Sequence, residues 1–576
     1  MLWLALHLPA LSLEAWQSTL GPQQAGRPLA LLQDHQILLA DGLAQARGVR
    51  PGMKRATALA LAPDLLQAAA DAQRDALALR AVAHVALAFS PAVSWATPPA
   101  LRASGEFADA QPAAHVGLVG VRLEVQASLR YFGGLPALLR RLAATLAPLG
   151  HRVCIACAPT ALGAALLAAG SASQAGPAET GLPVGDPLVG GPLVIDTFAL
   201  GPHSTGPSPR QALQALLDAL PLPLLGAGLA HWPVLQGMGL HTLADLRSLP
   251  RSGLARRFGP ALLDEIDRAR GHAPDAHTWL TLPLQFASRI ELLCRADTSA
   301  QVLAGAQLLL ARLLAWAGAS QSRIARFTRV MHHEPSRRER DTPTHTALEI
   351  APAEPAADPG HLLALLTERL GRLPLAAPAL DLSLHCNHLV AGAAPNGELF
   401  ASRASERAGL ARLVERLQAR LGAQQVQCLA PVPDHRPECG THWQAADPAR
   451  LGQQPGAREA GASAVPPAAR AGDAASPPTP PTLAQQAALL TAQPLWLLPE
   501  PRPLVARDQG LWLDGQPLQL LAGPERLETG WWQADGLVLR DYFIAQRPGG
   551  ALVWVFRQRL PDPAAGPGWC LHGLFA

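Results

Sequence analysis

The hydrophobic positions in the first third of the chain change between the repeat typical of strands and the repeat typical of helices. The apolar runs 1–9, 119–125 and 152–157 predict three core strands. The segments 136–147 and 160–169 carry apolar residues at helical spacing and predict two helices. This order of elements predicts a sheet covered by helices.

The middle of the chain predicts three further blocks. Residues 29–69 are expected to be mainly helical, and a Gly/Pro/Ser-rich stretch at 201–208 precedes a small helical block that ends near Gly271. Between 279 and 431 the pattern is strand, helix, two strands, helix, strand and a further helix. The order βαββαβ is typical of a compact α+β module.

The last part of the chain changes in character. Residues 441–482 are rich in Ala, Pro and Gly and predict a disordered linker. Beyond 494, short apolar runs are separated by the turn pairs Asp514-Gly515, Asp535-Gly536 and Gly549-Gly550, which predict hairpins in a small β-rich domain. Its tryptophans are interpreted as the core of that domain.

Composition narrows these expectations only slightly. The chain has 576 residues, 49% of them hydrophobic, and a net charge of +3, so we expect several domains and only local positive patches for any DNA contact. The seven cysteines are scattered, and the CxxC pair Cys154 and Cys157 is expected on a buried strand, so we expect neither a disulfide framework nor a metal site. No apolar run is long enough to span a membrane, and we expect a cytoplasmic protein.

Several segments resemble the Y-family (lesion-bypass, UmuC/DinB-like) DNA polymerases. The stretch 48–53, Gly-Val-Arg-Pro-Gly-Met, is similar to the fingers of that family. Leu-Glu-Val at 123–125 with Phe-Gly-Gly at 132–134 is similar to a palm strand, and 155–159 is similar to the family's G-I-A segment. The resemblance covers roughly residues 1–430. It implies a right-hand architecture with palm, fingers, helix-hairpin-helix thumb and βαββαβ little finger.

The departures from the family pattern bear on function. Active members hold two Mg²⁺ ions on three carboxylates, which clamp the attacking and leaving oxygens. In this chain, the two aspartates of the family's first acidic motif fall on Ala5 and His7, and the Asp-Glu pair of its second motif falls on Val119 and Gly120, so none of the three metal-ligand positions keeps a carboxylate. A neutral imidazole does not replace hard oxygen ligands for Mg²⁺. The resemblance therefore implies no catalytic residue, no metal and no cofactor. The family's phosphate-handling Tyr, Arg and Lys are also replaced, by Gly42, Gln45 and Ala164.

Within the family, the chain is similar to the ImuB type, a non-catalytic relative that acts in bacterial damage-induced mutagenesis. The tail segments 494–504, 540–542 and 571–575 add to this resemblance. It implies DNA, the sliding clamp (β), a DnaE-like error-prone polymerase and a RecA-like ImuA-type protein as partners, and no membrane. The domain assignment that follows is palm 1–28 and 80–200, fingers 29–79, thumb 209–275, little finger 279–431, linker 441–482 and C-terminal partner-binding domain 483–576.

Two regions are expected to contact DNA. Gly237 and Gly239 lie in a predicted helix-hairpin-helix, where backbone N–H groups and a helix N-terminus can approach a phosphate. An ordinary turn between two helices is the alternative; the nearby arginines, among them Arg256 and Arg257, favour DNA. In the little finger, Arg323, Arg326 and Arg329 recur on one strand, with Arg323 and Arg329 expected on the same face; a solvated strand face is the alternative.

A clamp-binding peptide of the form Q-x-x-L-F is matched by Asn396, Leu399 and Phe400, with Asn in the Gln position. The segment lies between a predicted strand and a predicted helix, where an exposed loop is expected.

Two other functions stay open from the sequence. One is an active Y-family translesion polymerase whose acids lie elsewhere, and the other is a helix-hairpin-helix repair enzyme. The length and the palm-like first third argue against the second.

Overall fold

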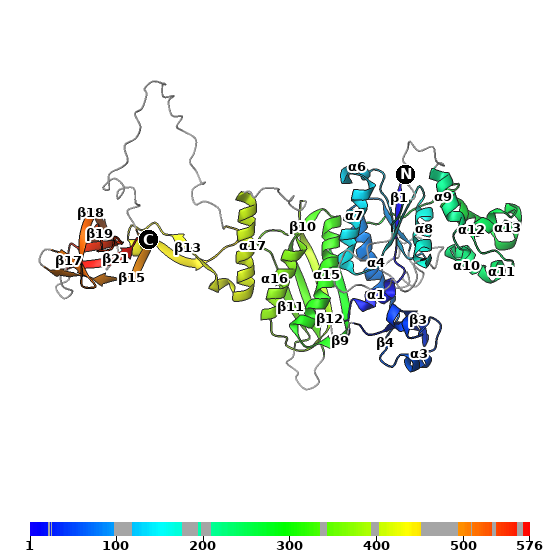
Figure 1. Cartoon of the computed structure of the whole chain (residues 1–576), viewed down its shortest axis with the longest axis horizontal. Helices are drawn as coiled ribbons and strands as arrows, with labels where there is room; N and C mark the ends of the chain where they lie inside the picture. Colours follow the sequence, from blue (N-terminus) through cyan, green and yellow to red (C-terminus); the bar gives the residue numbers. More distant parts are fainter. Residues whose placement is uncertain are drawn as a thin grey trace, which may run out of the picture. The chain divides into compact units, whose positions relative to one another are not determined.

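The computed structural model describes residues 1–20, 24, 26–96, 118–174, 194–196, 209–334, 343–392, 403–450, 494–507, 510–532, 537–560 and 568–575. The chain divides into two compact units, Met1–Arg420 and Leu421–Ala576. Figure 1 shows the elements of each unit, coloured along the sequence from the N-terminus in blue to the C-terminus in red.

The palm-like domain is a five-stranded sheet in the order β5-β6-β1-β7-β8. Strand β1 lies at the centre and pairs antiparallel with β6 and β7. All three strands predicted from the sequence are confirmed, as are both helices, with small shifts at their ends. The bounds are β1 (Trp3–His7), β5 (Val93–Ala96), β6 (Gly120–Glu124), β7 (Cys154–Ala158), β8 (Val194–Asp196), α7 (Leu135–Leu146) and α8 (Ala161–Gln174).

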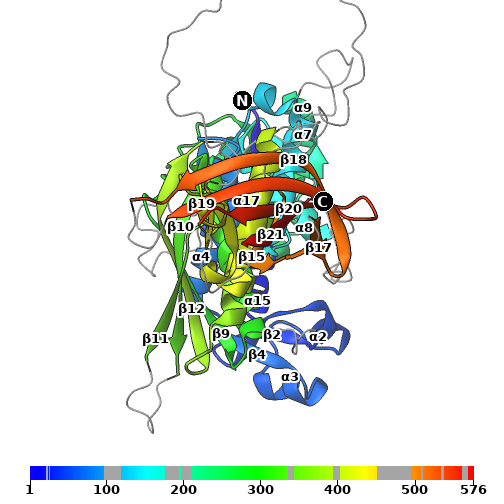
Figure 2. The ribbon, with the colours of Figure 1, turned by 90° about the vertical axis from the view of Figure 1, so that its left-hand side faces the viewer.

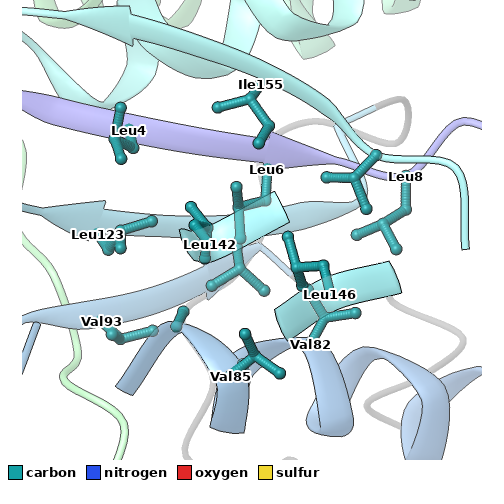
Figure 3. Packing of buried hydrophobic residues seen from close by; sticks show 14 of the residues in the cluster. Leu4, Leu6, Leu8, Val82, Val85, Val93, Leu123, Leu142, Leu146 and Ile155 are labelled. Atoms are coloured by element: carbon teal, nitrogen blue, oxygen red, sulfur yellow. The ribbon is translucent and has the colours of Figure 1, made fainter. Parts of the chain in front are cut away.

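Successive side chains of β1 point to opposite faces of the sheet, and each face packs against different helices. Leu4, Leu6 and Leu8 point toward α4 (Ala72–Leu87) and α7, where they meet Val82 and Leu142 in the main palm core (Figure 3). Trp3 and Ala5 belong to the other face, which packs against α8 and the thumb-like helices. Since neighbouring residues of a strand point to opposite faces, the replaced metal-ligand positions 5 and 7 lie on the side opposite α4.

The fingers-like domain differs from its prediction. Residues 29–69 form a three-stranded sheet, β3-β2-β4, with two short helices, so the expectation of a mainly helical segment is wrong. The Leu- and Ala-rich runs have high helix propensity, but each is only four or five residues long and pairs with a neighbouring strand. The bounds are α1 (Leu11–Gln17), β2 (Leu29–Gln33), β3 (Gln36–Ala40), α2 (Gly42–Ala46), α3 (Arg55–Leu61) and β4 (Leu66–Ala69).

The thumb-like domain is a block of short helices, as predicted. Asp218 accepts hydrogen bonds from Arg247 at 2.6 Å and from Arg270 at 2.8 Å, and so joins three of these helices. The bounds are α9 (Pro209–Asp218), η4 (Leu222–Leu224), α10 (Gly226–Ala230), α11 (Trp232–Gly237), α12 (Leu243–Arg247), α13 (Arg251–Phe258) and α14 (Pro260–Arg270).

The little-finger-like module has the predicted βαββαβ order, followed by a helix. Its sheet is ordered β11-β10-β12-β9, and α15 and α16 contribute to the core on one face. Helix α15 is long and apolar enough to cross a membrane by composition, but 61% of its apolar window is buried inside the protein. The bounds are β9 (Phe286–Ala296), α15 (Ser299–Ala319), β10 (Ser322–His333), β11 (His345–Ile350), α16 (Pro359–Arg372), β12 (Ala379–Ala391) and α17 (Arg403–Leu421).

The second unit is β-rich, as predicted. A hairpin of β13 (Gln427–Pro431) and β14 (Thr441–Ala445) precedes a seven-stranded sheet, whose long strands β18 and β19 are visible in Figure 2. The predicted linker therefore begins later than residue 441, and residues 451–482 lie outside the described part. The bounds are η6 (Pro437–Cys439), β15 (Trp496–Pro503), β16 (Val505–Arg507), β17 (Gly510–Leu513), β18 (Gln516–Thr529), β19 (Val538–Gln546), β20 (Leu552–Gln558) and β21 (Trp569–Leu574).

Candidate nucleic-acid interface

The four positions at which the resemblance predicts acidic residues come together in the palm. His7 pairs with Gly120 across the β1–β6 ladder, and the Nδ1–H of His7 donates a 3.0 Å hydrogen bond to the carbonyl oxygen of Val119. Ala5 lies two residues earlier on the same strand. We call Ala5, His7, Val119 and Gly120 the palm site. A small pocket of about 10 Å³ is lined by all four, so little space remains among them.

The palm site is electrically neutral or positive. Burial lowers the pKa of His7 to about 4, while its hydrogen bond to Val119 acts in the opposite direction, so the imidazole is neutral at pH 7. Arg122 is paired with Ala5 across the strands and lines the same small pocket. Burial lowers the pKa of Arg122 below the usual arginine range, and the nearby Asp275 opposes that shift. Among the described residues, no cluster of His, Cys, Asp or Glu has the form of a metal site.

Gly120 is held in close contact with the central strand. A Cβ atom added to it would lie 2.2 Å from the carbonyl oxygen of Leu6, well inside van der Waals contact. The carbonyl belongs to the backbone of β1, and the Cβ would be fixed to the backbone of β6, so neither can move away as the end of a flexible side chain could. A carboxylate side chain at position 120 therefore has no room unless these two strands move apart.

The predicted helix-hairpin-helix is present as α11, a turn at Gly239 with φ of +77°, and α12. Its backbone N–H groups, however, are already used. Those of Met238, Gly239 and Leu240 donate to carbonyls of α11. The carboxylate of Asp245 accepts from the N–H groups of His241 and Thr242, both at 2.8 Å. These amides are occupied in this conformation, so the turn offers a phosphate less than its sequence predicts.

The exposed cations of the thumb lie on α13 instead. Arg256 and Arg257 are both exposed, and neither has an ion pair within the described part of the chain. Arg251, on the same helix, is bound to Asp267 at 2.5 Å. Two unpaired guanidinium groups on one short helix can contact DNA phosphates without reading sequence.

The little-finger arginines differ in burial and do not form one DNA-facing surface. Arg326 is exposed and lies 3.3 Å from Glu349. Arg329 is fully buried in the core, and its three guanidinium nitrogens make no hydrogen bond within the described residues. It therefore cannot contact DNA from this position. Register shifts between Ile324 and Thr328 break the simple alternation on which the predicted shared face of Arg323 and Arg329 depended.

The outward face of the little-finger sheet carries histidines from two neighbouring strands. His332 and His385 are each bonded to the hydroxyl of Ser383, at 3.1 and 3.2 Å. Arg289 on the same face is bound to Asp381 at 2.6 Å. Burial lowers the pKa of His332, and the charge of Arg289 lowers it further. Arg289 is thus paired with an acid, and His332 is neutral at pH 7, so neither adds net positive charge to this face.

Comparisons with known proteins show what the chain as a whole is similar to. No protein-family model matches the chain. Protein ImuB from two strains of Caulobacter vibrioides is 28% identical over 539 residues, which are 92% of this chain and 100% of those proteins. Along almost its whole length the chain is similar to these ImuB proteins.

Solved structures extend the comparison to the polymerase-like part. A solved ternary complex of Dbh aligns with 68% of the chain and 100% of its own length, at 14% identity and a TM-score of 0.35. The crystal structure of DinB from Sulfolobus solfataricus aligns with the same shares, at 14% identity and a TM-score of 0.34. The structure itself shows a five-stranded palm-like sheet, a block of short thumb-like helices and a βαββαβ module, in that order along the chain.

The predicted clamp peptide of this chain lies outside the described residues, since Asn396, Leu399 and Phe400 all fall within 393–402. Strand β12 ends before this segment, and helix α17 begins after it. Its assignment stays a prediction from the sequence.

The C-terminal domain holds a polar cluster, partly buried, that sequence reasoning missed. The guanidinium of Arg540 donates to both carboxylate oxygens of Glu438, at 3.0 and 3.1 Å, and to the hydroxyl of Tyr542 at 3.0 Å. Tyr542 and the fully buried His572 are hydrogen-bonded at 2.8 Å. The cluster fastens the η6 loop to the sheet, because Glu438 comes from that loop. No short motif links residues 438 and 540, so spacing could not have revealed it.

The tryptophans of this domain range from buried to exposed, with Trp512 and Trp569 of intermediate burial. Trp554 is buried and stacks on Tyr542 at a centroid distance of 3.9 Å. Trp496, Trp531 and Trp532 are exposed, with 70%, 76% and 53% of their surface accessible. The expectation that the tryptophans form the core is thus correct for Trp554 and wrong for the exposed three.

Proposed function

We propose that the chain is a non-catalytic adaptor in translesion DNA synthesis and damage-induced mutagenesis. It binds DNA, the sliding clamp and an error-prone replicative-type polymerase, and does not itself add nucleotides. The observation that carries the proposal is the palm site. The four positions that should hold metal-binding acids meet in space, and they contribute two small apolar side chains, a glycine and a neutral histidine.

Electrostatics supports the absence of catalysis. Two Mg²⁺ ions bring four positive charges to one site, and hard carboxylate oxygens normally compensate them. Here His7 is neutral at pH 7 and Arg122 adds a positive charge beside Ala5. Restoring one acid elsewhere in the palm site would not restore a two-metal site, because position 120 has no room for a side chain. The alternative, an active Y-family polymerase, needs acids from residues outside the palm site.

DNA binding is supported by the thumb more than by the little finger. Arg256 and Arg257 are exposed on α13, whereas Arg329 is buried and Arg326 is near an acid. Contacts of this kind go to phosphates and release counterions, so they favour binding at any sequence and weaken as salt rises. That behaviour suits a protein that acts wherever damage occurs.

Partner binding is supported by two parts of the chain. The peptide with Leu399 and Phe400 fits a clamp ligand in which an apolar pair fills a hydrophobic pocket. In the C-terminal domain, Trp496, Trp531 and Trp532 are exposed, and large aromatic side chains are common anchors of protein interfaces. We assign the DnaE-like polymerase and the RecA-like ImuA-type protein to this domain.

A primer-extension assay on the purified chain tests the proposal. With Mg²⁺ or Mn²⁺, a primer–template and all four nucleotides, we expect no extension, while fluorescence anisotropy on the same sample shows salt-sensitive DNA binding. An active Y-family polymerase under the same conditions is the control. Template-directed extension that co-elutes with the chain in gel filtration would overturn the non-catalytic assignment.

A further inference from the structure

A second pocket lies on the other side of the palm sheet from the palm site, where the palm meets the little finger. It has a volume of about 120 Å³ and is lined by residues of three elements and of the segment that leads into β9. We call it the junction pocket. Its lining residues are Leu77, Arg80, Ala81, His84, Pro283, Gln285, Phe286, Ala287, Ser288 and Arg312.

The lining is basic at its inner end. Arg80 and His84 come from one face of α4, four residues apart, and Arg312 comes from α15. His84 and Arg312 are each only 3% exposed. No Asp or Glu is among the described residues that line the pocket. The outer end opens between the exposed residues Pro283, Gln285 and Ala287.

Arg312 lacks the partner that a buried charge requires. Its Nη1 donates to the hydroxyl of Ser288 at 3.2 Å, but its Nε is buried and makes no hydrogen bond within the described residues. Burial lowers the pKa of Arg312 to about 10, so the group is still charged at pH 7. A buried charge without an opposite charge is costly, and the folded protein retains this cost unless an anion enters.

We propose that the junction pocket binds a phosphate group. A phosphate group carries between one and two negative charges at pH 7, and the pocket is lined by the two guanidinium groups of Arg80 and Arg312. Its tetrahedral oxygens accept hydrogen bonds from several directions, and planar guanidinium groups bind them with two donors at once. Burial lowers the pKa of His84 to about 4, so it enters as a neutral ring that donates one N–H.

Size limits the ligand. A water molecule in the liquid occupies about 30 Å³, so the pocket holds about four waters or one phosphate group. The phosphate comes either from inorganic phosphate or from a small nucleotide whose remainder leaves through the opening beside Gln285. Long nucleic acid is disfavoured, because the pocket is on the α4 side of the palm sheet, away from Ala5 and His7.

A bound phosphate would join two domains. Arg80 and His84 belong to the palm, whereas Ser288 and Arg312 belong to the little finger. The anion would neutralise charges contributed by both, so its binding and the docking of α15 on α4 should strengthen each other.

Isothermal titration calorimetry on the full chain in chloride buffer tests the proposal. Inorganic phosphate should bind saturably at one site. Arg312→Met and Arg80→Gln should each weaken that binding at least tenfold, since each removes a charge-assisted hydrogen-bond donor. Arg140→Gln, which changes an exposed arginine on α7, is the matched control and should bind as the parent does.

Stability provides the second readout. Without phosphate, Arg312→Met should melt at the same temperature as the parent or higher, because it removes an uncompensated buried charge. If Arg312→Met does not fold, the half-buried Arg80 still provides the test. No saturable phosphate binding by the parent, or equal binding by all variants, would overturn the proposal. A parallel titration with adenosine monophosphate identifies the source: tighter binding than inorganic phosphate indicates a nucleotide, and equal binding indicates phosphate alone.

Discussion

Gly120→Ala tests whether the palm site is closed to any side chain. The added Cβ would lie 2.2 Å from the carbonyl oxygen of Leu6, whereas ordinary contacts begin at 3.4 Å. The strands β1 and β6 would have to move apart by about 1 Å, a large change for neighbours that are about 4.8 Å apart. Such a change breaks or lengthens the backbone hydrogen bonds on both sides of residue 120.

The cost follows from two contributions. Overpacking a well-filled site destabilises by about 1–3 kcal/mol, and each weakened backbone hydrogen bond adds about 1 kcal/mol. We expect the free energy of opening of β1 and β6 to fall by about 2–4 kcal/mol in total. Amide exchange in these strands should then accelerate by roughly 30- to 1,000-fold, since 1.4 kcal/mol corresponds to a factor of ten.

Hydrogen exchange followed by mass spectrometry measures this effect in peptides that cover β1 and β6. Gly409→Ala is the matched control, because Gly409 lies in α17 with nothing within 4 Å of an added Cβ. Alanine there should stabilise its helix by about 0.5–1 kcal/mol and leave the palm unchanged. If Gly120→Ala exchanges at the parent rate in β1 and β6, the steric closure of the palm site is refuted.

Three further predictions follow from other parts of the chain. Changing Leu399 and Phe400 to Ala should abolish clamp binding in a pull-down and leave DNA affinity unchanged; retained clamp binding would exclude this peptide. Changing Arg256 and Arg257 to Gln should weaken DNA binding at every sequence and reduce the slope of log affinity against log salt by about 1–2, as anisotropy titrations would show; an unchanged slope would place the DNA contacts elsewhere. His7→Gln should remove a pH dependence of the free energy of unfolding. The pKa of His7 is about 4 in the folded state and 6.5 in the unfolded state, so between these pH values only the unfolded state binds the proton. Stability of the parent therefore falls as pH falls from 6.5 to 4, by up to about 3 kcal/mol, and denaturant unfolding of the variant should lack this loss.

Much of the palm and little finger was predictable from the sequence. The strands around Leu6 and Ile155 are short apolar runs, and the helices between them have clear helical spacing. The fingers were not predictable in the same way, because Leu- and Ala-rich runs such as 29–33 suit a helix until strand pairing is known. Pairing depends on contacts between distant residues, which local pattern does not contain.

The candidate site, too, was only partly predictable from the sequence. The lost acids at Ala5 and His7 were identified from the sequence, and the structure brings them beside Val119 and Gly120. The burial of Arg329 was not predictable, since the irregular register of β10 changes which residues face the core. The junction pocket was also hidden, because its charged residues are more than two hundred positions apart along the chain.

Manganese binding measured by electron paramagnetic resonance tests the central claim most directly. The parent chain and His7→Gln are titrated with Mn²⁺, each with and without primer–template DNA. Because the palm site offers no carboxylate, the two proteins should bind the same number of ions with the same affinity. One or two additional tightly bound ions in the parent that are lost in His7→Gln would show a working metal site and contradict the account.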